Sequence, residues 1–266
     1  MKQSSVKLNS VTCGDCRCLI SALPDYSIDV VVTSPPYCEQ RNDHYPGVPE
    51  DEYPAFTLES MTQVAPKLAR NGSVLIVIDP HIRDGMVSDY VLKTRLLLRE
   101  HGWLEHQPQK WHKPDAYPMG RKDWPRHAYE EVLWFSLGRK PFCDPWACAV
   151  PSPNVAVNRY RGSEWSNGYE SPKPGKSRCT DVIQISIGAE KGIDHPAKFP
   201  VALAEHLIQR FSPPGGAVLD CFCGSGTTLV AAKKLGRKWY GIDIVQDYCE
   251  LARKRIAGTA RLPRAG

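Results

Sequence analysis

Short runs of β-branched apolar residues alternate with stretches of helical spacing along this chain of 266 residues. The strand pattern occurs in five segments: 28–33, 73–78, 129–136, 217–222 and 238–243. A sixth and weaker strand candidate lies near 103–110. Apolar positions recur at helical spacing in 52–69, 85–101, 200–211, 227–235 and 246–257. We expect Asn71-Gly72 to end the first of these helices. Strands and helices that alternate in this way predict an α/β fold, with a mostly parallel sheet covered by helices on both faces.

The composition is that of a globular protein, with 42% hydrophobic and 24% charged residues. No apolar run reaches the ~18 to 20 residues of a membrane span, and the N-terminus lacks a signal pattern, so we expect a cytoplasmic protein. Ten cysteines are scattered along the chain, including Cys13 and Cys16 in one Cys-x-x-Cys pair. Without a second such pair, reduced thiols are the favoured interpretation over a zinc site, and no metal is expected.

Positive charge is concentrated between Pro108 and Thr180, where 12 basic residues accompany 7 acidic ones. Five of the seven tryptophans fall in the same stretch. Basic groups interleaved with aromatic rings suit a surface that meets phosphates and stacks on bases. A solvated insertion with tryptophans packed beneath it would give the same composition.

A glycine-rich turn follows the strand predicted at 217–222. The segment Asp220-Cys-Phe-Cys-Gly-Ser-Gly226-Thr-Thr228 leads into a helix, and Asp243 ends the next strand. Glycines at such a turn let the backbone approach a ligand, and the downstream carboxylate can accept hydrogen bonds from ribose hydroxyls. Leu229 stands where a dinucleotide fingerprint has its third glycine, and no Gly-Lys-Ser/Thr follows. A ligand with a ribose but no pyrophosphate is therefore expected.

The segment Thr33-Ser-Pro-Pro-Tyr37 directly follows a buried strand. It therefore lies at the carboxyl edge of the sheet, where α/β folds bind ligands. Two prolines stiffen the loop, which can present Ser34 Oγ and the Pro35 carbonyl as paired acceptors, with Tyr37 as a stacking platform. This combination suits the exocyclic amine of a base, whose two hydrogens need acceptors. A proline-stiffened surface turn is the alternative for this segment taken alone.

These two segments, together with His195-Pro-Ala-Lys-Phe-Pro200, resemble the amino-methylating DNA methyltransferases that use S-adenosylmethionine. The catalytic loop precedes the cofactor glycines, an order that resembles the β group of this family. The resemblance extends from Gly14 to about residue 257. It implies a Rossmann-like methyltransferase fold with permuted motif order and a small irregular target-recognition insertion.

The resemblance also implies residue roles, carried over by position. The catalytic loop is matched by Ser34, Pro35, Pro36 and Tyr37. Cofactor contacts are implied for Asp15, Thr33, His195, Lys198, Phe199, Asp220, Phe222, Gly224, Ser225, Gly226, Thr227 and Asp243. Asp15 matches an acid near the adenine, and Asp243 matches the ribose acid. One departure concerns Cys221, because the family commonly has proline there; we expect cofactor binding to survive this change.

The residues that contact DNA are assigned less precisely than those that bind the cofactor. Trp111 to Phe135, with Lys113, His127 and Glu130, is similar to the family's target-base pocket, and the target-recognition region is expected at 139–180. Contacts to DNA are expected from Arg41, Lys113, Arg121, Lys122, Arg159, Arg161, Lys173, Lys176 and Arg178. The chain then divides into a catalytic half (1–138), the recognition insertion (139–180) and a cofactor-binding half (181–266). The implied partners are double-stranded DNA, a cognate restriction endonuclease and a second copy of the chain, in a cytoplasmic, nucleoid-associated protein.

The expected reaction moves a methyl group from S-adenosylmethionine to the N4 amine of a flipped cytosine, in a restriction–modification system. Serine at the first catalytic position is more typical of cytosine-N4 members, and aspartate of adenine-N6 members, so adenine remains the alternative base. Carbon-5 methylation is disfavoured because its cysteine nucleophile usually follows proline, and no Pro-Cys dipeptide occurs here. More distant alternatives are a nicotinamide-dependent oxidoreductase, a DNA-binding protein without activity, and an enzyme that acts on RNA.

Overall fold

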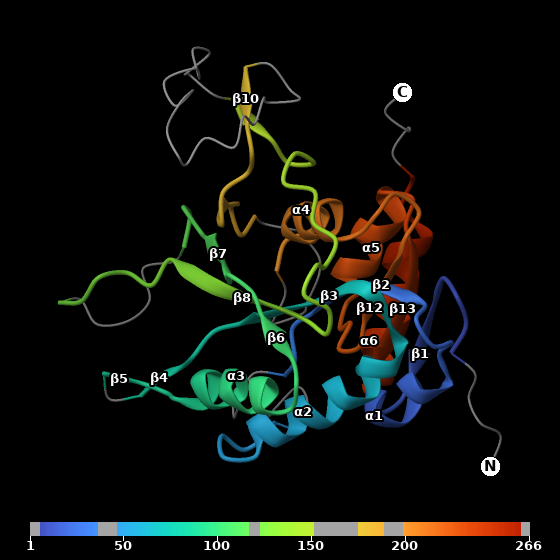
Figure 1. The fold of residues 1–266 in the computed structure, drawn as a ribbon, viewed down its shortest axis with the longest axis horizontal. Helices are drawn as coiled ribbons and strands as arrows, with labels where there is room; N and C mark the ends of the chain where they lie inside the picture. Colours follow the sequence, from blue (N-terminus) through green and yellow to red (C-terminus); the bar gives the residue numbers. More distant parts are fainter. Residues whose placement is uncertain are drawn as a thin grey trace.

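The computed structural model describes residues 6–36, 47–83, 85–116, 123–151, 175–188 and 199–261. Within these residues, nine strands form one sheet in the order β1-β13-β12-β2-β3-β8-β7-β11, with β6 paired to β8 (Figure 1). Their bounds are β1 Ser10–Cys13, β2 Ile28–Thr33, β3 Leu68–Ile78, β6 Leu104–Glu105, β7 Gln109–His112, β8 Tyr129–Ser136, β11 Val182–Gln184, β12 Ala217–Asp220 and β13 Lys238–Asp243. Two short hairpins stand apart: β4 Ile82–Arg83 with β5 Met86–Val87, and β9 Val150–Pro151 with β10 Lys176–Ser177.

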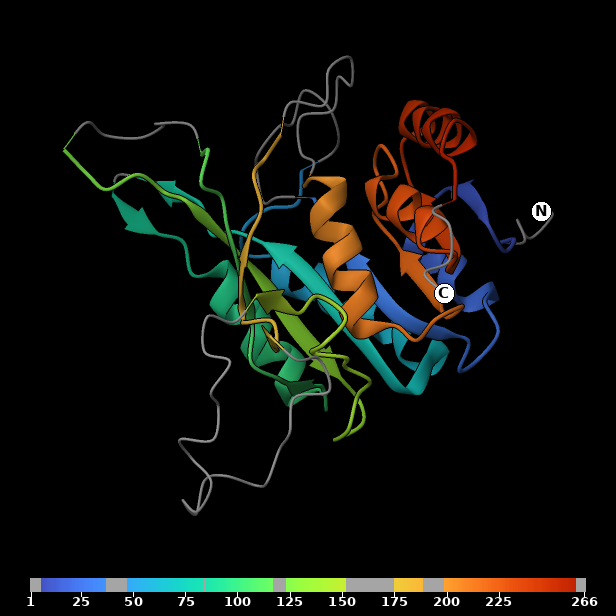
Figure 2. The same ribbon diagram turned by 90° about the horizontal axis from the view of Figure 1, so that it is seen from above.

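Helices cover both faces of the sheet, as expected (Figure 1, Figure 2). One face carries α1 (Cys16–Leu19), α2 (Tyr53–Val64) and α3 (Tyr90–Glu100), which pack on strand residues such as Val31 and Ile76. The other face carries α4 (Val201–Phe211), α5 (Thr227–Lys234) and α6 (Gln246–Ala257), which pack on Val30, Val32 and their neighbours. Because side chains along a strand point alternately to opposite faces, the apolar runs of β2 and β3 supply both cores.

The direction of the strands places the carboxyl ends of five of them at one edge. β1, β13, β12, β2 and β3 pair in parallel along the sheet. β8 runs antiparallel to both β3 and β7. The loops after β1, β2, β3, β12 and β13 therefore meet at the same edge, which is where an α/β sheet binds its ligands.

Several elements have the bounds that the sequence predicted. β2, β8, β13 and α6 coincide with their predicted segments. Strand β3 begins at Leu68 rather than residue 73, and α2 ends at Val64, where the short 3-10 turn Ala65–Lys67 follows it. Asn71-Gly72 was expected to end a helix, but it lies inside β3. The register shifts there, because Ile28 pairs with Leu68 while Val30 pairs with Ser73. The turn-forming residues thus occupy an irregularity in a strand.

Two regions differ from the predicted pattern. The helix expected at 85–101 begins only at Tyr90, since the preceding residues form the β4–β5 hairpin around Gly85, whose φ is +83°. The single strand expected near 103–110 is divided into β6 and β7. β1 and α1 were not predicted: β1 has four residues and pairs with β13 alone, so its apolar pattern is too short to recognise.

The proposed catalytic and cofactor-binding halves share the one sheet. Strands β12 and β13, from 181–266, lie between β1 and β2, both from 1–138. The described ends of the 139–180 insertion pack against the C-terminal end of α4, where Asp144 N donates to Arg210 O at 2.7 Å. The N-terminal end of that helix follows Phe199 at the ligand edge. The insertion therefore joins the sheet far from that edge.

In the described part of the chain, no helix is long and apolar enough to cross a membrane. The cysteines described there are free thiols, of which Cys16, Cys221, Cys223 and Cys249 are buried and Cys18 is exposed. Cys38 lies outside the described residues.

Candidate active site

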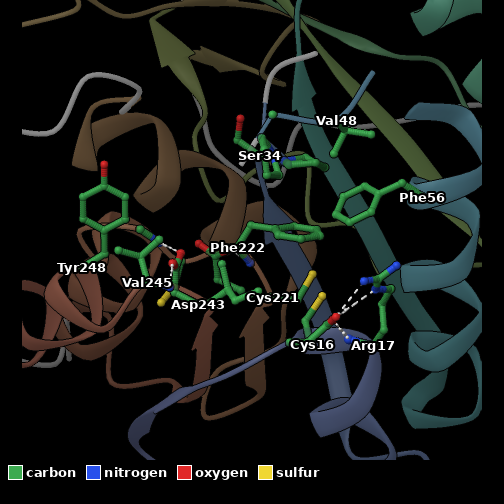
Figure 3. Close-up of a pocket in the computed structure, with 18 of the residues that line it drawn as sticks. Cys16, Arg17, Ser34, Val48, Phe56, Cys221, Phe222, Asp243, Val245 and Tyr248 are labelled. Carbon is green, nitrogen blue, oxygen red and sulfur yellow. Dashed lines mark hydrogen bonds and ion pairs between the residues drawn. The ribbon is translucent and has the colours of Figure 1, made fainter. Parts of the chain in front are cut away.

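A cavity of about 610 Å³ opens at the carboxyl edge of the parallel strands (Figure 3). Its lining comes from the loops after β1, β2, β12 and β13, together with α2 and Phe199. Ser34, Pro35 and Pro36, which leave β2, share this cavity with the turns that follow Asp220 and Asp243. The two segments singled out in the sequence, 187 residues apart at Thr33 and Asp220, thus form one site.

Asp220 ends β12 with its carboxyl group almost completely buried (3% exposed). Its Oδ1 accepts hydrogen bonds from Thr33 Oγ1 at 2.7 Å and from the Phe222 backbone N–H at 3.2 Å. Burial raises the pKa of Asp220 to about 6, against the hydrogen bonds from Thr228 and Thr33, which lower it. Thr33 was expected to touch the cofactor, but it is fully buried and positions Asp220 instead.

The glycine turn is held by the second carboxylate. Asp243 Oδ2 accepts the Gly224 N–H at 2.7 Å, and its Oδ1 accepts the Val245 N–H at 3.0 Å. Burial raises the pKa of Asp243, while the backbone N–H groups oppose that shift. Gly224, with φ of +47°, brings the backbone to the cavity wall as expected. One carboxylate therefore fixes the turn and also faces the cavity.

At Gly226, glycine is required for helix packing and not for the approach of the backbone to a ligand. A Cβ at this position would lie 2.8 Å from Ala252 Cβ in α6, and the φ of +80° disfavours side chains. The residue permits the packing of α5 against α6 rather than an approach to a ligand. Its neighbours Ser225 and Thr227 do line the cavity, at the N-terminal end of α5, where backbone N–H groups favour a negatively charged ligand group.

Apolar walls flank the carboxylates. In the view of Figure 3 the Phe222 ring lies between Asp243 and the Phe56 ring; the two ring centroids are 5.6 Å apart. Val245 and Tyr248 complete the wall beside Asp243. A flat ring can lie against this surface while a hydroxyl-bearing group reaches the carboxylate.

Asp15 lies in the lining, but its carboxylate is engaged by Arg17. The two side chains meet at 2.7 Å, and Arg17 holds the pKa of Asp15 below its usual range. Arg17 also contacts Glu59 at 2.9 Å and lies over the Phe56 ring. Sequence reasoning missed Arg17, Phe56 and Glu59, because they lie in α1 and α2 outside any motif.

The next strand, β3, is followed by an acid, Asp79, near the segment Ser34–Pro36. Thr33 pairs with Ile76, so Ser34–Pro36 leaves β2 alongside the end of β3 and Asp79. Asp79 Oδ2 contacts His127 Nε2 at 2.8 Å, which raises the pKa of His127. Within the described residues, Asp79 Oδ1 is buried without a hydrogen-bond partner. This buried acceptor lies just after the end of β3, outside the cavity lining.

The expected DNA contacts are placed as follows. Lys113 is 9% exposed and forms an ion pair with Glu130 at 2.9 Å, so it braces β7 against β8 instead of meeting a phosphate. Lys176 and Arg178 are exposed in the insertion, away from the cavity. Outside the described residues lie Tyr37, Arg41, Arg121, Lys122, Arg159, Arg161, Lys173, His195 and Lys198.

Known proteins are similar to this chain over most of its length. Residues 28–254 match the family model for N6/N4 methyltransferases, described as DNA methylase. Type II methyltransferase M.BglII of Bacillus subtilis is 29% identical over 94% of this chain and 69% of the relative. M.PvuII of Proteus hauseri is 27% identical over 90% of this chain and 81% of the relative.

Solved structures are similar over most of the chain. One is the PvuII DNA methyltransferase, described as cytosine-N4-specific, with a TM-score of 0.74 and 25% identity over 94% of this chain and 87% of that one. Another is the putative DNA modification methylase TTHA0409 of Thermus thermophilus in complex with S-adenosyl-L-methionine. Its TM-score is 0.61, with 28% identity over 93% of this chain and 94% of that one.

Proposed function

Because this chain belongs to the N6/N4 DNA methylase family, we propose that it transfers a methyl group from S-adenosylmethionine to the N4 amine of a cytosine flipped out of double-stranded DNA. The observation that carries the proposal is the shared cavity. The rigid acceptor loop Ser34–Pro36 and the carboxylate-bearing turns at Asp220 and Asp243 line the same space. A methyl donor and an amine could meet there without a further domain.

The residues around the cavity fit S-adenosylmethionine. When bound, the cofactor supplies a methyl group on a positively charged sulfur. Asp243 would accept hydrogen bonds from the ribose hydroxyls, and Phe222 with Val245 would flank the adenine. Asp220 and the N-terminal end of α5 would receive the charged ends of the amino-acid part, since one favours a cation and the other an anion.

The catalytic loop would hold the amine. Ser34 Oγ and the Pro35 carbonyl offer two acceptors for the two amine hydrogens, on a backbone that the prolines stiffen. Both hydrogen bonds favour a pyramidal nitrogen, whose lone pair is then available for in-line attack on the methyl group. Proximity and orientation would supply most of the acceleration. No covalent intermediate with the enzyme is required.

Asp79 would assist at the same point. Methylation leaves the amine positively charged, so a proton must depart. Asp79 Oδ1 is a buried acceptor at the end of the neighbouring strand, and His127 holds the other oxygen in place. We assign Asp79 to hydrogen bonding or proton acceptance near the target amine, and His127 to positioning Asp79.

Cytosine is favoured over adenine on two grounds. Ser34 stands at the first catalytic position, and a solved structure of the same fold is described as cytosine-N4-specific. N6 methylation of adenine is the second candidate, because the matching family covers both amines. The same acceptors could hold either base.

Recognition of a particular DNA sequence is assigned to residues 139–180, with 1–138 and 181–266 as the catalytic and cofactor-binding halves. The relatives are named type II methyltransferases, which favours a restriction–modification setting with a partner endonuclease. A second copy of the chain is a further proposed partner.

The proposal is tested by incubating the protein with DNA of varied sequence and S-adenosylmethionine labelled in its methyl group. Mass spectrometry of the nucleosides should find the label in N4-methylcytosine. Label in N6-methyladenine would move the assignment to the second candidate. Label in RNA alone, or in no base, would refute the proposed function.

A further inference from the structure

Two thiols lie together in the wall of the cofactor cavity. Cys16 is the first residue of α1, and Cys221 follows the last residue of β12. Both line the cavity, yet they are only 4% and 1% exposed. Figure 3 shows their sulfur atoms facing each other below the Phe222 ring. Segments remote in the sequence thus place a dithiol where a ligand would bind.

The contacts of the two thiols differ. Cys221 Sγ donates to Thr33 Oγ1 at 3.8 Å, and a hydrogen bond joins the Cys16 and Cys221 thiols. Cys16 Sγ lies 3.9 Å from Ser60 Oγ. The hydrogen bond between the two thiols lowers the pKa of Cys16, whereas the same hydrogen bond and burial raise the pKa of Cys221. Because the thiolate is the reactive form, Cys16 is the more nucleophilic of the two.

A second close pair of thiols provides an internal comparison. Cys249 Sγ lies 3.5 Å from the Asp243 carbonyl, and Cys13 is close enough to contribute to the raised pKa of Cys249, which burial brings to about 12. Neither residue lines the cavity. Cys249 therefore combines proximity to a second thiol with low reactivity.

We propose that Cys16 and Cys221 form a reactive dithiol that hydrogen peroxide oxidises to a disulfide, and that this bond impairs binding of the cofactor named under the proposed function. The Cys16 thiolate attacks one oxygen of the peroxide, the O–O bond breaks, and a sulfenic acid forms at Cys16 as water leaves. The Cys221 thiol then attacks the Cys16 sulfur, forming the S–S bond and releasing a second water. Two thiols are oxidised by two electrons, and the peroxide is reduced.

The geometry explains why the bond would matter. A disulfide holds its sulfur atoms at ~2.05 Å, well inside the distance of a thiol–thiol contact. Closing that gap draws the turn at Cys16, with Asp15 and Arg17, toward Asp220 and Phe222. It also removes Cys221 from Thr33, the residue that holds Asp220. Both changes distort the cofactor wall.

The residue at 221 gives the proposal a natural control. Proline is common there in the family that this chain resembles, and proline carries no thiol. C221P should therefore abolish the oxidation, and it introduces the residue that the corresponding turn commonly has in that family. C13S removes a thiol from the other pair and should leave the oxidation intact.

The experiment treats the full chain with hydrogen peroxide and measures two quantities. Non-reducing tryptic mass spectrometry should find residues 8–17 linked to residues 211–233, and fragment ions should locate the bond at Cys16 and Cys221 rather than Cys13 or Cys223. Calorimetry should show affinity for S-adenosylmethionine falling about tenfold or more, with recovery after dithiothreitol. C13S should behave in the same way, and C221P should lose the peroxide effect.

The second readout depends on the proposed cofactor, whereas the first does not. A linked peptide without any cofactor binding by the reduced protein would contradict the proposed function and the effect on binding, but not the dithiol. Absence of the Cys16–Cys221 peptide, or unchanged affinity once it has formed, would overturn the inference.

Discussion

The two parts of the proposed site are built in different ways. On the side proposed for the cofactor, Asp220 accepts the Phe222 N–H from the turn that follows it, and Asp243 accepts the N–H groups of Val245, in its own turn, and of Gly224, in the turn after Asp220. In the part proposed for the target base, Asp79 lies outside the cavity lining; its Oδ2 contacts His127, and its buried Oδ1 has no hydrogen-bond partner among the described residues. The first arrangement is complete before a ligand arrives, while the second offers a free acceptor. This difference suggests that cofactor affinity and methyl transfer can be changed separately by mutation.

The largest effect is expected from S34A. This substitution removes the side-chain acceptor for the target amine, and the methyl-transfer rate should fall about a hundredfold or more. Affinity for S-adenosylmethionine should stay within about threefold, because Ser34 donates nothing to the Asp220 or Asp243 turns. Single-turnover assays and calorimetry measure the two quantities. A near-normal transfer rate would remove Ser34 from the catalytic role.

Next in size is D243A. It leaves the N–H groups of Gly224 and Val245 without their acceptor and removes the carboxylate proposed for the ribose. Affinity for S-adenosylmethionine should fall about ten- to a hundredfold. D247A is the matched control, since Asp247 is exposed on the neighbouring helix outside the cavity lining. If D243A and D247A lost the same affinity for S-adenosylmethionine, the loss would come from the change in overall charge and not from the contacts of Asp243 in the cavity.

A smaller effect is expected from pH acting on His127. Asp79 raises its pKa, so the ion pair is fully present below the ordinary value of ~6.5 and is lost as pH rises through the raised value. The transfer rate should fall a few-fold across that range, and H127Q should flatten this limb of the pH profile. An unchanged profile in H127Q would exclude positioning of Asp79 by the charged imidazole.

The smallest effect concerns stability rather than activity. Burial raises the pKa of Asp220 to about 6, so the folded chain binds this proton more tightly than the unfolded chain does. The contribution of Asp220 to the free energy of unfolding should therefore decrease as pH rises from ~4 to ~6. D220N keeps an acceptor for Thr33 but does not ionise. Urea unfolding measures the free energy of unfolding of both proteins. The value for D220N minus that for wild type should rise by about 1 to 3 kcal/mol between pH 4 and pH 7. If the difference in free energy of unfolding between D220N and wild type did not change with pH, the raised pKa of Asp220 would be contradicted.

The sequence predicted the cofactor side better than the target side. Asp220, Gly224 and Asp243 belong to one strand–turn–helix–strand unit, so their spacing already places them together. Thr33 and Gly226 were correctly placed in that region, but their roles depend on contacts with Asp220 and Ala252 that spacing does not reveal. Long, strongly apolar strands such as β2 and β13 were recognisable, whereas the four-residue β1 was not.

The target side is assembled from residues remote in the chain. Asp79 and His127 belong to different strand ends, and only the antiparallel pairing of β3 with β8 brings them together. Lys113 looked like a DNA contact because it lies in a basic stretch. Its burial against Glu130 depends on the β7–β8 register, which no local pattern specifies.

The most direct test of separable sides is the single-turnover rate of methyl transfer to DNA as a function of S-adenosylmethionine concentration, compared between S34A and D243A. At saturating cofactor, D243A should recover most of the wild-type rate, because its defect is in binding. S34A should remain slow at every concentration, because its defect is in the transfer step. Recovery of S34A, or persistent failure of D243A once cofactor binding is saturated, would contradict this account of the cavity.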